Sequence, residues 1–99
     1  MFNTRFGDLF EWDENKNIEN IKKHGVSFDE AVEAFLDKKR VIIEDYKHSS
    51  IEKRFFCIGK YQDDILTVRY TVRESRIRII GAGFWRKERG IYEKKSSLY

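Results

Sequence analysis

The sequence has no proline, and it has one cysteine and one methionine among its 99 residues. The lone Cys57 cannot form an intramolecular disulfide and lies in the apolar run RFFCIG, so we expect a buried and unreactive thiol. No apolar run approaches the roughly 18 residues of a membrane-spanning helix. The first ten residues, MFNTRFGDLF, lack the continuous apolar segment of a signal peptide. We therefore expect a cytoplasmic protein without a membrane partner.

Residues that bind metals or cofactors are also sparse. The two histidines, His24 and His48, have no cysteine or carboxylate at the spacing of a zinc motif. There is no Walker-type phosphate loop, and GAGFW (81–85) lacks the rest of a dinucleotide fingerprint. We expect no metal and no organic cofactor.

The residues that are abundant indicate a small, charged, folded domain. Hydrophobic residues make up 40% of the chain and aromatic residues 15%, enough for one modest core, and we expect a single domain over residues 1–99. The net charge of +3 is unevenly distributed. Residues 1–68 carry 11 Lys and Arg against 14 Asp and Glu, whereas residues 69–99 carry 9 against 3. A basic C-terminal third favours a polyanionic or acidic partner.

Capping residues predict two consecutive helices after a first strand over residues 5–12, in which Gly7-Asp8 is a candidate turn or bulge. Asp13 is placed to cap a helix over 14–24 that ends at Gly25, with Ile18 and Ile21 as its apolar positions. Ser27 and Glu30 then form a capping-box pattern. The second helix is expected over 28–37, with its buried side formed by Val32, Phe35 and Leu36.

The rest of the chain has the two-residue period of strands. Strands are expected over residues 41–44, 54–60, 65–72 and 76–82, with a loop over 45–53. Helical composition returns over 85–95, where Gly90 weakens the middle of the helix. The fold class is therefore α+β: an antiparallel sheet of about four strands packed against helices, with a C-terminal helix.

The alternation of apolar and polar side chains predicts the register of the last hairpin, formed by the strands expected over 65–72 and 76–82. A two-residue loop at Glu74-Ser75 places Leu, Val, Tyr and Ile side chains on one face and Thr and Arg side chains on the other, whereas a three-residue loop mixes the faces. The polar face then carries four arginines: Arg69, Arg73, Arg76 and Arg78. Two interpretations remain open for them. They bind phosphates, with nearby Tyr61, Tyr70, Trp85 and Tyr92 stacking on bases, or they form an ordinary solvated surface.

Residues 10–31, FEWDENKNIENIKKHGVSFDEA, resemble the opening signature of the BrnT family of ribonuclease toxins. The similarity continues through Asp45, His48 and Ser49, through EKRFFCIG and LTVRYTVRESRIRII, and ends at ERGIYE. The resemblance implies a compact RelE-like domain that cleaves RNA without a metal, by attack of a ribose 2′-hydroxyl on the adjacent phosphate. It also implies a cognate BrnA-like antitoxin as partner, with operator DNA contacted only through that antitoxin.

From this resemblance and the basic face we derive the candidate site. The catalytic candidates are His24, Arg54, Arg76, Arg78 and Glu88, and the RNA-binding candidates are Arg69, Arg73, Arg86 and Tyr92. The arginines are expected to bind phosphate and His24 or Glu88 to transfer protons. For His24 a structural role at the helix end is equally consistent with its position, because a histidine there interacts with free carbonyls.

The chain departs from the family pattern after the last strand. Where many members have ISAR, this sequence has Ile80-Gly81-Ala82-Gly83, so glycines replace a serine and an arginine. A loss of activity is one consequence, with the chain acting only as an antitoxin-binding or nucleic-acid-binding module. A second interpretation is that another cation, such as Arg86, replaces the missing arginine. A third is that the glycines allow a ligand to approach the backbone closely.

Overall fold

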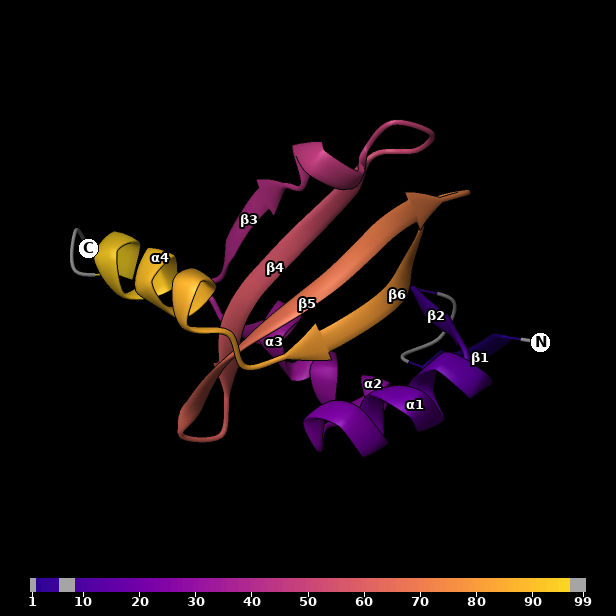
Figure 1. Cartoon of the computed structure of the whole chain (residues 1–99), viewed down its shortest axis with the longest axis horizontal. Coiled ribbons are helices and arrows are strands. Elements are labelled where there is room, and N and C mark those ends of the chain that lie inside the picture. The colour runs from indigo at the N-terminus through magenta and orange to yellow at the C-terminus, as the bar shows by residue number, and fades with distance from the viewer. Residues whose placement is uncertain (1, 6–8, 97–99) are drawn as a thin grey trace.

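The computed structural model describes residues 2–5 and 9–96, which form one sheet flanked by helices on both faces (Figure 1). The helices are α1 (Glu14–His24), α2 (Phe28–Ala31), α3 (Glu33–Leu36) and α4 (Arg86–Ser96), with a short 3-10 turn, η1 (Tyr46–His48). The strands are β1 (Phe2–Arg5), β2 (Phe10–Asp13), β3 (Val41–Glu44), β4 (Arg54–Tyr61), β5 (Asp64–Arg73) and β6 (Arg76–Gly83). The α+β class with a C-terminal helix is confirmed.

The sheet is larger and more mixed than expected. Six strands in the described ranges have the order β1-β2-β6-β5-β4-β3, where about four were expected. β2 pairs with β6 in the parallel direction, so the expectation of a wholly antiparallel sheet was wrong. The single first strand expected over 5–12 is replaced by parts of β1 and β2, which pair antiparallel and extend the sheet beyond β6. The expected Gly7-Asp8 turn lies outside the described residues.

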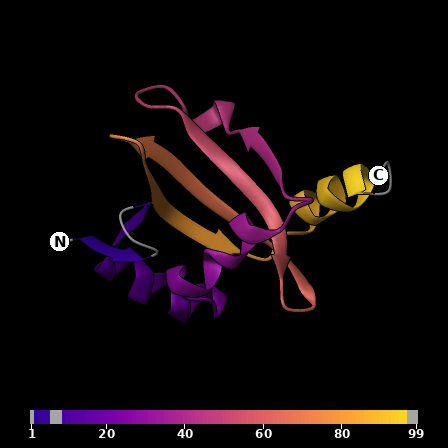
Figure 2. The ribbon, with the colours of Figure 1, turned by 180° about the vertical axis from the view of Figure 1, so that it is seen from behind.

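Two cores lie on opposite faces of the sheet. In Figure 1, α3 lies behind the strands, and in Figure 2, seen from behind, it passes in front of them. The larger core, between the sheet and α2–α3, contains Phe10, Trp12, Phe28, Leu66 and Ile79 among others. The smaller core lies under α4 and contains Val41, Ile58, Ile65 and Tyr92. Because α4 covers only one end of its face, the rest of that face is open for function. No helix in the described ranges is long and apolar enough to span a membrane.

The helix ends follow the predicted capping residues. The carboxylate of Asp13 accepts a 2.8 Å hydrogen bond from the backbone N–H of Asn15 at the start of α1. Gly25 ends this helix with a φ of 71°, a conformation that glycine adopts without steric cost. The side chains of Ser27 and Glu30 each accept a hydrogen bond from the other's backbone N–H, which confirms the capping box.

The predicted buried faces of the helices were partly wrong. Ile18 and Ile21 of α1 are each 45% exposed, and Asn17 and Asn20 are buried instead. The asparagines occupy the inner face because α1 lies beside backbone groups that need hydrogen-bond partners: Asn17 accepts from the N–H of Phe28, and Asn20 bonds to the loop and to β6.

The second helix also differs from the expectation. Instead of one helix over 28–37, two short helices, α2 and α3, meet at Val32. Leu36 is 63% exposed, although it was expected to be buried, while Val32 is buried and Phe35 packs at the edge of the larger core.

The register of the last hairpin is confirmed. Arg73 pairs with Arg76 across the two-residue loop Glu74-Ser75, whose φ values of 51° and 66° are those of a type I′ turn. The expected polar face is less exposed than predicted, because Thr67 and Thr71 are buried. On the other face Val72 is half exposed, since it lies at the hairpin end beyond the covering helices.

Candidate functional site

Five arginines gather on the face of the sheet that α4 covers only at one end. In the strand ladder Thr71 has Arg54 on one side and Arg78 on the other, so the three side chains share a face. We call the set of arginines on this side of β4, β5 and β6 the arginine face: Arg54, Arg69, Arg73, Arg76 and Arg78. Sequence alternation predicted four of them, and pairing between β4 and β5 adds Arg54.

Two carboxylates partly neutralise this face. Glu52 accepts hydrogen bonds of 3.1 and 3.2 Å from Arg73, and the buried Glu11 accepts one of 3.2 Å from Arg76. The hydrogen bond from Arg73, assisted by the charges of Arg54 and Arg78, lowers the pKa of Glu52. The arginine face carries more guanidiniums than these two carboxylates of the described residues, so it favours an anionic ligand.

Arg69 lies at the centre of the site and borders two hollows. It is opposite Phe56 on β4 and Gly81 on β6. A Cβ atom built on Gly81 would lie 2.7 Å from Nη2 of Arg69, so the guanidinium lies directly on the glycine backbone. Among the described residues no carboxylate pairs with Arg69.

The first hollow bordering Arg69 lies against α1 and has a volume of about 240 Å³. We call it the α1 hollow; it is lined by Lys16, Glu19, Asn20, Lys23, His24, Arg69 and Ile80. Lys16, Asn20, Lys23 and His24 recur at helical spacing and therefore share one face of α1. The α1 hollow thus places three cationic side chains and a histidine around one space.

The second hollow bordering Arg69 has a volume of about 300 Å³ and is lined by Phe56, Arg69, Trp85 and Glu88. We call it the aromatic hollow. Trp85 also contacts His24, whose ring meets the indole edge-on with centroids 5.3 Å apart and planes inclined at 68°. A Cβ atom built on Gly83 would lie 2.7 Å from the Trp85 ring, so the indole packs on the backbone of Gly83.

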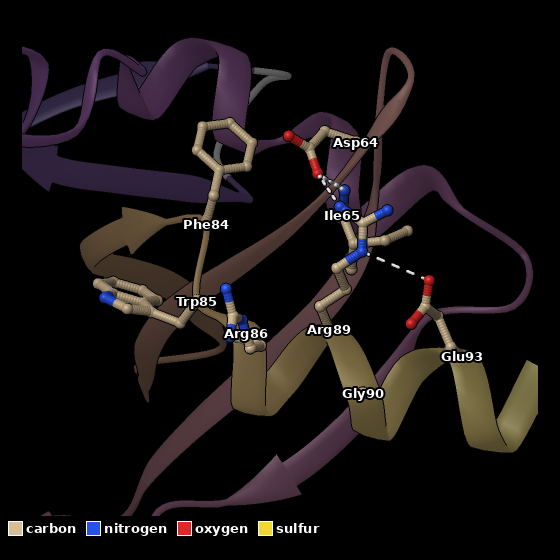
Figure 3. A pocket seen from close by; sticks show the side chains of 8 residues that line it. All are labelled: Asp64, Ile65, Phe84, Trp85, Arg86, Arg89, Gly90 and Glu93. Atoms are coloured by element: carbon tan, nitrogen blue, oxygen red, sulfur yellow. Dashed lines mark hydrogen bonds and ion pairs between the residues drawn. The ribbon is translucent and has the colours of Figure 1, made fainter.

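A larger hollow of about 490 Å³ lies farther along α4 and is shown in Figure 3. Its central cation, Arg89, is bound to two carboxylates, at 2.9 Å to Asp64 and 3.4 Å to Glu93. The exposed Arg86 also lines it. Because Arg89 is already neutralised and the arginine face lies elsewhere, size alone does not make this hollow the site.

The structure brings some predicted residues together and separates others. His24 and Glu88 line different hollows, each of which Arg69 borders, and Trp85 contacts His24 and lines the hollow of Glu88. Tyr92, a candidate for RNA binding, is only 4% exposed, and its hydroxyl donates a 2.6 Å hydrogen bond to Asp37. Burial and this hydrogen bond raise the pKa of Tyr92. Tyr92 therefore packs in the smaller core, with its hydroxyl already hydrogen-bonded.

Sequence reasoning did not select Lys16, Lys23 or Phe56. The two lysines follow the spacing of Asn20 and His24 on α1, and that spacing was available in the sequence. Phe56 could be assigned to the site only once the β5 residue opposite it, Arg69, was known. In residues 2–5 and 9–96 no three His, Cys, Asp or Glu side chains form a group suited to a metal ion.

Comparison with known proteins identifies one related family. The family model described as ribonuclease toxin, BrnT, of type II toxin-antitoxin system matches residues 12–88. This match spans α1, the arginine face, Trp85 and Glu88, and thus both hollows that Arg69 borders. No curated protein matches the chain.

Proposed function

The chain belongs to the BrnT family of ribonuclease toxins, and we propose that it is a metal-independent endoribonuclease that cleaves RNA and inhibits growth. The observation that carries this proposal is the α1 hollow, whose lining combines His24 with the cations Arg69, Lys16 and Lys23 against one carboxylate, Glu19. Three cations around one proton-exchanging group match the needs of phosphodiester cleavage, in which negative charge develops on phosphate oxygens.

In the proposed reaction the scissile phosphate occupies the α1 hollow. His24 in its neutral form accepts the proton of the ribose 2′-hydroxyl, whose oxygen forms a bond to phosphorus. The bond from phosphorus to the 5′-oxygen breaks, and the ammonium group of Lys16 or Lys23 supplies a proton to that oxygen. The products are a 2′,3′-cyclic phosphate and a 5′-hydroxyl, and no oxidant, reductant or metal is consumed.

The arginine face holds the neighbouring part of the RNA in this proposal. Arg54 and Arg78 flank the small, buried Thr71, so their guanidiniums face a strip of sheet without bulky side chains. Guanidinium groups match two phosphate oxygens at once. Nε of Arg54 is buried and has no hydrogen-bond acceptor in the described part of the chain, so we propose that phosphate binds to the other nitrogens of this guanidinium.

Membership of a type II toxin-antitoxin family implies an antitoxin partner. We propose that a BrnA-like antitoxin neutralises the toxin by covering the arginine face with acidic side chains, and that operator DNA is contacted only through the antitoxin. An acidic segment on this face would exclude RNA by occupying the same cations.

The proposal is tested with a labelled single-stranded RNA, in the presence of a metal chelator, and with colony survival after induced expression. We expect the wild type to produce fragments with 2′,3′-cyclic phosphate ends and to stop growth. His24→Gln should reduce cleavage by about 100-fold or more, the usual contribution of a proton-transfer group, and one of the two variants Lys16→Ala and Lys23→Ala should do the same.

The matched control is Lys22→Ala, because Lys22 is the exposed neighbour of Lys23 on α1 and does not line the hollow. It should cleave like the wild type. Intact RNA with folded wild-type protein would overturn the proposal and favour a binding module that only holds an antitoxin. Full activity of His24→Gln would refute the role of the α1 hollow.

A further inference from the structure

We propose that the aromatic hollow is a guanine-binding pocket that selects the base next to the cleaved bond; this inference rests on the proposed function. The aromatic hollow lies at the end of the arginine face. Phe56 on β4 and Trp85 after β6 are both partly buried and line the same space as Arg69 and Glu88. Aromatic side chains paired with polar groups are the usual means of holding an unpaired base.

The two glycines of β6 shape the floor of this pocket. Arg69 lies on the backbone of Gly81, and Trp85 lies on that of Gly83, each closer than a Cβ atom at the glycine would allow. The indole also makes an edge-on contact with the ring of His24. Side chains at positions 81 and 83 would lift the guanidinium and the indole, so the glycines keep both groups flat against the sheet.

The polar groups of the pocket are one donor and one acceptor, and both retain bonding capacity. No hydrogen bond or ion pair joins Arg69 or Glu88 to another described residue. Arg69 is a multiple donor and Glu88, when ionised, accepts with two oxygens. A base that offers both two adjacent acceptors and two adjacent donors would satisfy them together.

Guanine is the base with that arrangement. Its O6 and N7 accept from an arginine, and its N1–H and N2–H₂ groups donate side by side to a carboxylate. Adenine and cytosine present a single amino group to Glu88. The N3–H of uracil lies between two carbonyl oxygens, which the carboxylate would repel. The shared position of Arg69 connects this base to a phosphate in the α1 hollow.

The test measures the affinity for each of the four nucleoside 3′-monophosphates, by tryptophan fluorescence and by calorimetry. Trp12 is buried in the larger core, so quenching by a bound base reports on Trp85. We expect guanosine 3′-monophosphate to bind about tenfold or more tightly than the other three, as one good two-point contact allows. Glu88→Gln should reduce this preference to about threefold or less while the weaker nucleotides bind as before.

Matched variants separate recognition from folding and from cleavage. Glu93 lies on the same helix as Glu88 but lines the larger hollow of Figure 3, so Glu93→Gln should leave the preference for guanosine 3′-monophosphate unchanged. Gly83→Val should displace Trp85 and abolish quenching in a protein that is still folded by circular dichroism. Trp85→Phe should remove the quenching while calorimetry still detects binding.

Several results would overturn the pocket. These are equal affinity for the four nucleotides, absence of binding in a protein that cleaves RNA, or an unchanged preference in Glu88→Gln. Loss of cleavage in Glu88→Gln with the guanine preference intact would assign proton transfer to Glu88 instead. A wild type that prefers guanosine 3′-monophosphate but leaves RNA intact would refute the ribonuclease proposal and retain the pocket.

Discussion

Replacing Asn20 with alanine should test how α1 is attached to the sheet. The Asn20 amide donates 2.9 Å hydrogen bonds to the carbonyls of Val26 and Ala82, and its oxygen accepts a 3.1 Å bond from the N–H of Ala82. Ala82 lies between Gly81 and Gly83, which support Arg69 and Trp85. Asn20 therefore fixes α1, and with it His24, relative to the floor of the site.

The expected loss of stability follows from the polar groups that Asn20→Ala leaves without hydrogen-bond partners. Val26 and Ala82 are almost fully buried, so Asn20→Ala leaves one N–H and two carbonyls with little access to water. An unsatisfied buried polar group costs about 1–3 kcal/mol, with some relief from relaxation. We expect a loss of about 3 kcal/mol in the free energy of unfolding, a large part of the roughly 5–15 kcal/mol typical of a domain.

The assay is urea unfolding followed by circular dichroism, with Asn15→Ala as the control on the same helix. Asn15 is exposed, so its replacement should change the free energy of unfolding by less than about 0.5 kcal/mol. A second variant, Asn20→Asp, places a carboxylate against two carbonyls. It should cost more than alanine at pH 7 and recover below about pH 4, where the acid is protonated and can donate.

The reasoning would be refuted by a loss below about 1 kcal/mol in Asn20→Ala, or by equal effects of Asn20→Ala and Asn15→Ala. The same variants also report on function. Because Asn20 holds His24 beside Trp85, Asn20→Ala should lower RNA cleavage even at temperatures where the protein remains folded, whereas Asn15→Ala should not.

Three further predictions concern the core and the turn. Tyr92→Phe removes the hydrogen bond to Asp37 and should destabilise the protein by about 2 kcal/mol in urea unfolding; RNA affinity in a filter-binding assay should stay unchanged, and a loss would place Tyr92 at the ligand. Replacing Glu74-Ser75 with Asn-Gly should raise the melting temperature by several degrees, because both residues have positive φ; no increase in a calorimetric scan would contradict this. Burial raises the pKa of Cys57 to about 12, so a disulfide thiol reagent should label it only in urea, and rapid labelling of native protein would refute the burial.

Part of the site was predictable from the sequence, for local reasons. Alternation of arginines along two strands determined which face carries the positive charge, and the two-residue turn determined the register. The family signature indicated His24 and Glu88 as candidates. The sequence did not indicate that both residues lie near Trp85, because helix and strand periods give directions within one element and no distances between elements.

The sequence by itself determined where α1 begins and ends, where the next helix begins and where the last hairpin turns. Asp13 and Gly25 bound α1, and Ser27 with Glu30 starts the next helix, because capping hydrogen bonds join residues only a few positions apart. Only the tertiary structure decided which helix face is buried. Asn17 and Asn20 replace Ile18 and Ile21 on the inner face because backbone groups of distant segments need partners there. The same long-range contacts created the two hollows around Arg69.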